Sequence, residues 1–233
     1  MANILILGAG SMGTAFSFPC SDNGHSVSIV GTHLENDFID KINSTRKHPA
    51  LDCEMQKNVK FFKFEKLKEE INNKIDLIVI AVVSKGIEWA SNEISKVLKN
   101  NVPILILTKG LAINNNKFEV LAHKMERLLK KNGTKETNIS AAGGPCLAKN
   151  LANKAHTAVV FANKDIKEVE KISKLVSTDY YHISTSEDVA GVEICAAIKN
   201  IFSMAVGASQ GLCDASKSKE KNYLNTAAAL MQE

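Results

Sequence analysis

The chain has 233 residues, 45% of them hydrophobic, enough for one large domain, or one domain and part of another, around a buried core. Its net charge of +4 is spread along the chain, and the lack of a basic stripe interleaved with aromatics argues against a nucleic-acid interface. Five cysteines lie far apart without a C-x-x-C pair, and the histidines show no metal-ligand spacing. We therefore expect free thiols in a reducing compartment, with neither disulfides nor a metal site. Without a charged leader or an apolar run near 18 residues, we expect a cytoplasmic protein that makes no membrane contact.

The first half of the chain alternates short apolar runs with longer stretches of helical period. The apolar runs are rich in β-branched residues and predict buried strands at 4–7, 27–30, 77–80 and 104–107. The intervening stretches predict helices at 12–23, 34–43, 85–99 and 117–131. The last helix is expected to bury one stripe, made of Phe118, Leu121, Met125, Leu128 and Leu129. This alternation favours right-handed βαβ crossovers and hence a doubly wound α/β sheet.

The second half first continues this pattern and then becomes purely helical. Strands are expected at 138–142, 156–161 and 180–183, with a short helix from about 146 and a charged helix at 165–176. Residues 187–210 lack strand punctuation and predict one long buried helix, and another is expected to begin near Asn225. We place a domain boundary near residue 185, so that 186–233 is the beginning of an all-helical second domain. The chain stops at Glu233 inside a helical pattern without a C-cap glycine, so we expect it to be truncated.

The run Gly8-Ala9-Gly10-Ser11-Met12-Gly13 matches G-x-G-x-x-G directly after the first strand, at the start of a helix. In this context the first glycine makes a tight turn, the second lets the backbone approach a pyrophosphate, and the third lets helix pack on strand. The free N–H groups and the dipole of the helix start favour that negative group. The turn therefore predicts a Rossmann dinucleotide-binding domain over residues 1–185, with Gly8, Gly10 and Gly13 at the cofactor.

The tip of the second strand bears on the choice between NAD and NADP. NAD-specific sites usually carry an acid there, about twenty residues after the glycine turn, that binds the ribose 2′-hydroxyl. Here the strand ends in Thr32 and His33, and the nearest acid is Glu35, so we expect no carboxylate to repel a 2′-phosphate. Thr32 and His33 are the candidate donors to that phosphate, although His33 fits an exposed loop histidine equally well. The expected cofactor is NADP or NAD, with NADP favoured.

Two lysines have positions that suit catalysis. Lys109 follows the fourth strand at the carboxyl end of the sheet, where α/β folds bind ligands. Lys199 is embedded among small and apolar residues of the long helix, so it either reaches solvent along its stem or pairs with a substrate. If both point into one cleft, their ammonium groups lower each other's pKa. One can then exchange a proton with an alcohol as hydride leaves the same carbon, while the other attracts an anionic substrate and polarises its oxygen.

Several segments, taken together in their order and spacing, resemble the NAD(P)-dependent glycerol-3-phosphate dehydrogenase family. They are 8–15, 108–110, 144–148, 193–200 and 225–230. Thr32 and the segment 46–49 look more like the archaeal-type branch of this family, which accepts NADP. The resemblance implies a small phosphorylated substrate and the oxidation of sn-glycerol 3-phosphate to dihydroxyacetone phosphate, or the reverse. It also implies that Lys199 is the acid-base lysine, with Asn200 beside it, and that Lys109 lies near both nicotinamide and substrate.

The same resemblance implies roles in two loops. Ser11 and Met12 match backbone contacts to the pyrophosphate. The Gly-Pro loop matches the segment where substrate phosphate and cofactor meet, which implicates Gly144 and Cys146 in substrate binding and Ala148 in cofactor binding. Cys146 departs from the serine or threonine common in the family, and we expect a buried small side chain there, not a reactive thiol.

Two other functions stay open at this point. A related dehydrogenase with a Rossmann domain and a helical second domain, such as a ketopantoate reductase or a 3-hydroxyacid dehydrogenase, would also use a lysine–asparagine pair on a helix. A non-catalytic module that senses NAD(P) would suit a chain without the family's later substrate-binding segment. The oligomeric state is open as well, with a homodimer as one candidate, because an exposed Ala-Leu helix favours association.

Overall fold

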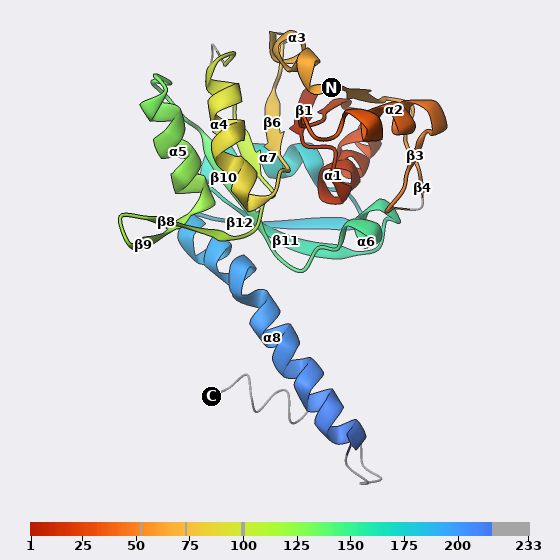
Figure 1. Ribbon diagram of the computed structural model, residues 1–233, viewed down its shortest axis with the longest axis vertical. Helices are drawn as coiled ribbons and strands as arrows, with labels where there is room; N and C mark the ends of the chain where they lie inside the picture. The colour runs from red at the N-terminus through yellow and green to blue at the C-terminus, as the bar shows by residue number, and fades with distance from the viewer. Residues whose placement is uncertain (52, 73, 99–100, 216–233) are drawn as a thin grey trace.

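The computed structural model describes residues 1–51, 53–72, 74–98 and 101–215, and it centres on an eight-stranded sheet (Figure 1). The strand order is β12-β11-β10-β7-β6-β1-β2-β5. These strands are β1 (Asn3–Leu7), β2 (Ser26–Val30), β5 (Val59–Phe62), β6 (Leu77–Ile80), β7 (Ile104–Ile106), β10 (Ile139–Gly143), β11 (Thr157–Ala162) and β12 (Tyr181–Ser186). Neighbouring strands run parallel except β10 and β11, which are antiparallel.

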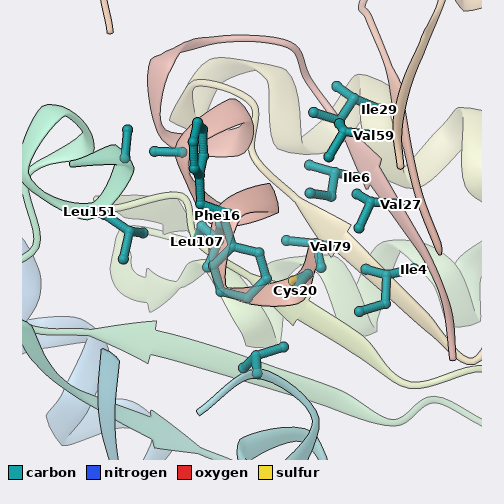
Figure 2. Close-up of a cluster of buried hydrophobic side chains, with 14 of the residues drawn as sticks. Ile4, Ile6, Phe16, Cys20, Val27, Ile29, Val59, Val79, Leu107 and Leu151 are labelled. Carbon is teal, nitrogen blue, oxygen red and sulfur yellow. The ribbon is translucent and has the colours of Figure 1, made fainter. Parts of the chain in front are cut away.

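Helices cover both faces of the sheet, as the doubly wound prediction requires. They are α1 (Ser11–Asp22), α2 (Asn36–Thr45), α3 (Leu67–Asn72), α4 (Ile87–Ser95), α5 (Leu121–Lys131), α6 (Ala148–Ala152), α7 (Ile166–Val176) and α8 (Val189–Ala215). In β1, Ile4 and Ile6 pack with α1, α2, α6 and α7, while Leu5 and Leu7 pack with α3, α4 and α5. Figure 2 shows the first of these clusters around Phe16. A strand buried on both faces must be apolar at every position, which is why the sequence marked β1 so clearly.

The predicted helix 117–131 is wrong over its first turn. Lys117–Val120 is strand β9, which pairs antiparallel with β8 (Leu111–Asn114) in a hairpin. Asn115 and Asn116 form its turn, both with positive φ, a conformation that asparagine tolerates better than most residues. Phe118 leaves the expected buried stripe as a result and is 81% exposed. A second short pair, β3 (Lys47–His48) with β4 (Cys53–Glu54), was not predicted either.

Helix α8 is long, as predicted, but most of it is not buried. Its first turns pack on the sheet, and the rest projects away from it (Figure 1). Met204 is 74% exposed and Ile201 65%. By length and composition alone Val189–Gly211 could cross a membrane, contrary to the expectation from the sequence. One such helix is weak evidence, because core helices of soluble proteins meet the same criterion. The helix expected near Asn225 lies outside the described residues.

Candidate active site

The glycine turn has the geometry of a pyrophosphate cradle. Gly8 has φ 111°, and a Cβ there would lie 2.7 Å from the carbonyl oxygen of Ala81. A Cβ on Gly13 would overlap the carbonyl oxygen of Gly8. Gly10 differs, because the nearest atom to a Cβ there is 4.0 Å away, at Glu35. No side chain caps the start of α1, and the open space beside Gly10 fits the pyrophosphate of a dinucleotide.

A carboxylate lies at the tip of β2, and the expectation that none does is wrong. Glu35 Oε2 accepts hydrogen bonds from the backbone N–H of Thr32, at 2.7 Å, and of Ala9, at 3.2 Å. Glu35 precedes α2, so the chain turns it back toward the glycine turn. Thr32 thus commits its backbone N–H to Glu35. The premise that favoured NADP therefore fails.

His33 is exposed, as one of its two interpretations expected, and its ring also has aromatic neighbours. Its ring packs against Trp89 with centroids 5.3 Å apart and against Phe64 at 6.5 Å, beside the end of β2. Trp89 comes from α4 and Phe64 from the segment after β5, so three remote segments meet there. The sequence offered no sign of this aromatic cluster, because its members are far apart along the chain.

The two lysines come together at the carboxyl ends of β7 and β10. Lys109 Nζ donates to the carbonyl oxygen of Gly144 at 2.9 Å. Burial lowers the pKa of Lys109, and the nearby charge of Lys199 lowers it further. Lys199 lines a cleft of about 510 Å³ together with Gly144, Cys195 and neighbouring residues of β10 and α8. Lys109 lines a small neighbouring pocket that shares Gly144 with this cleft, so the two lysines lie close together, and Lys109 is the one whose pKa is lowered by burial. Asn200 follows on α8, and its side chain lies outside the described part of the structure.

The Gly-Pro loop lies between the glycine turn and this cleft. Gly144 has φ 129°, which favours glycine, and it also accepts a hydrogen bond from the Cys146 N–H at 3.0 Å. Cys146 is buried, as expected, and its burial raises the pKa of the thiol. Ala148 begins α6, which packs against α1. Met12, Lys109 and Cys146 accordingly line one small pocket.

Another hollow, of about 520 Å³, lies near the opposite, amino ends of β7 and β10. Asn138, Asn163 and Glu168 are among its lining residues, and hydrogen bonds join Asn138 to each of the other two. Open α/β sheets bind their ligands beyond the carboxyl ends of the strands. The cleft beside Lys109 and Lys199 is therefore the candidate active site.

Glu193 is an important residue of this region that the sequence reasoning missed. It lies on α8, is only 4% exposed, and accepts hydrogen bonds from the backbone N–H groups of Leu121, at 3.1 Å, and Ala122, at 3.0 Å. Burial raises the pKa of its carboxyl to about 7, although the two donors work against this shift. The signal in the sequence that could have revealed this residue was an acidic side chain within an otherwise apolar helix.

Fold and glycine turn together define a Rossmann-type dinucleotide-binding protein. The family described as NAD-dependent glycerol-3-phosphate dehydrogenase N-terminus matches residues 3–169, and the chain belongs to this family. The NADP(+)-dependent glycerol-3-phosphate dehydrogenase of Archaeoglobus fulgidus is 30% identical over 208 residues, 89% of this chain and 60% of that protein. The glycerol-3-phosphate dehydrogenase [NAD(P)+] of Streptococcus suis is 32% identical over 90% of this chain and 60% of its own length. The chain thus spans about 60% of the length of these curated relatives.

Solved structures share the fold. A glycerol-3-phosphate dehydrogenase from Coxiella burnetii superposes with a TM-score of 0.78 at 23% identity, covering 99% of this chain and 65% of that one. Another from Plasmodium falciparum superposes with a TM-score of 0.80 at 20% identity, covering 99% and 63%. Both similarities extend into α8, where the helical part begins.

Proposed function

We propose that this chain forms the cofactor-binding domain and the lysine-bearing half of the active site of an enzyme that interconverts sn-glycerol 3-phosphate and dihydroxyacetone phosphate with NADP or NAD. The observation that carries the proposal is the meeting of Lys109 and Lys199 beside the glycine turn. The domain boundary near residue 185 belongs to the same proposal, as do a cytoplasmic location and a homodimer.

Each residue of the site then has a distinct task. The N–H groups of Ser11 and Met12 hold the pyrophosphate, and a bound nicotinamide ring supplies or accepts the hydride. Lys199 gives a proton to the carbonyl oxygen of dihydroxyacetone phosphate during reduction and takes one from the hydroxyl group in the reverse direction. Lys199 takes the acid-base role because it matches the family's acid-base lysine, and Lys109, which donates to Gly144, attracts the anionic substrate when it is protonated.

Cofactor titration tests this function directly. NADPH and NADH are added to the protein with and without dihydroxyacetone phosphate, while nicotinamide fluorescence reports binding and its decay reports oxidation. We expect saturable binding and, with substrate, oxidation that Lys199→Met abolishes. Binding without oxidation would fit a chain that carries only this half of the active site and is inactive by itself, and it would equally fit a non-catalytic NAD(P)-binding module. Oxidation with ketopantoate or a 3-oxoacid but not with dihydroxyacetone phosphate would favour a related dehydrogenase.

The carboxylate of Glu35 makes cofactor choice testable. Its negative charge beside Gly10 disfavours a 2′-phosphate, so Glu35→Gln should raise the affinity for NADPH relative to NADH about tenfold, or about 1.4 kcal/mol. Asp37→Asn, an exposed change of the same charge on the same helix, is the matched control. If the ratio of the affinities for NADPH and NADH is unchanged in Glu35→Gln, this carboxylate only stabilises the turn and does not select the cofactor.

A further inference from the structure

Helix α8 is held at its start from two sides. On one side, Gly143 of β10 packs so closely that a Cβ there would lie 2.7 Å from Val192 Cγ1. On the other, the buried carboxylate of Glu193 accepts the first two N–H groups of α5. Lys199 lies six residues further along the same helix. The position of its ammonium therefore depends on how these first turns are fixed.

The partner of Glu193 is connected directly to the other lysine. From Lys109 the chain passes through the β8–β9 hairpin and enters α5 at Leu121. The carboxylate that holds Leu121 and Ala122 thus joins the segment that begins at Lys109 to the helix that carries Lys199. The two strands of the hairpin also contact α8.

A purely structural cap would not need this arrangement. Val120, at the N-cap position of α5, provides no side-chain acceptor, although a local serine or aspartate could do so with little desolvation. Instead, the acceptor comes from a residue more than seventy positions away, as a carboxylate taken out of water. Two helix N–H donors and the helix dipole offset part of the cost of that burial.

We propose that Glu193 is a positioning residue that sets the spacing between Lys109 and Lys199, and so the geometry of proton transfer. This inference rests on the proposed function for its catalytic consequence, but the spacing itself can be measured without turnover. Glu193 touches neither substrate nor cofactor and acts through the two helices that it joins.

The test compares Glu193→Gln with Glu187→Gln, an exposed change just before the same helix. The amide keeps the shape of the side chain but points a donor at one of the two N–H groups. Acetic anhydride acetylates only the unprotonated amine. Peptide mass spectrometry of Lys109 after labelling from pH 7 to 10 therefore reports the fraction of this lysine that is unprotonated. In Glu193→Gln, Lys199 is no longer held beside Lys109, so the pKa of Lys109 should rise. The labelling of Lys109 at pH 8 should then fall about threefold.

Turnover adds a second readout. With dihydroxyacetone phosphate and NADH, Glu193→Gln should lower kcat about tenfold while the Kd for NADH stays within about twofold of the unsubstituted chain. If the unsubstituted chain binds NADH but shows no turnover, labelling of Lys109 alone decides the role of Glu193, whereas failure to bind NADH would contradict the proposed function. Unchanged labelling of Lys109 in Glu193→Gln, with only a lower melting temperature, would overturn the proposal. Glu193→Asp keeps the charge and should give intermediate labelling, and it replaces the glutamine variant in both tests if that variant does not fold.

Discussion

At the residue scale, two glycines of the turn serve different purposes: Gly10 is needed for cofactor binding and Gly13 for stability. Gly10→Ala places a methyl group in the open space before α1 at an ordinary φ of −64°, so stability should change by less than about 0.5 kcal/mol while NADH affinity is lost. Gly13→Ala forces a methyl group against Gly8 and Ala81 and should cost about 2 kcal/mol or more in unfolding free energy. Urea unfolding and cofactor titration of both variants check this. Equal loss of stability in the two variants would contradict these assignments.

At the scale of elements, the contact between α5 and α8 should depend on pH. Burial raises the pKa of Glu193 from 4.5 to about 7, so the folded state binds its proton more tightly than the unfolded chain. The stability this proton contributes is complete below about pH 4.5 and is lost as pH rises through about 7, by about 3 kcal/mol. Urea unfolding from pH 5 to 8 should show this fall in the unsubstituted chain and a flatter profile in Glu193→Gln. Parallel pH profiles for the two proteins would exclude such a titration.

For the whole molecule, the exposed apolar part of α8 should drive association. Ile201, Phe202 and Met204 lie exposed on this projecting helix. Apolar side chains gathered in this way lower the free energy when a second surface covers them. Sedimentation should therefore show a mass that rises with concentration, and the triple change to serine should return it to that of one chain. Val83→Ser, which removes an exposed valine elsewhere, should leave association unchanged.

Local patterns were sufficient for most of the fold. The apolar runs predicted β1, β2, β6 and β7 because a strand that is covered on both faces is apolar at every position. The glycine turn was recognisable because its six-residue pattern directly follows the first strand and opens a helix. The hairpin before α5 was missed because Phe118 continues the helical spacing of Leu121 and Met125, and only the asparagine turn interrupts it.

The sequence by itself determined the class of fold and the glycine turn and marked Lys109 and Lys199 as candidates, because each of these depends on neighbours along the chain. Only the tertiary structure decided what surrounds them. The carboxylate of Glu35 reaches the turn by a bend after β2, and the tie between Glu193 and Leu121 joins positions 72 residues apart. Hydrogen bonds between remote segments leave no periodic trace in a sequence, so the electrostatics of the site became visible only once the chain was folded.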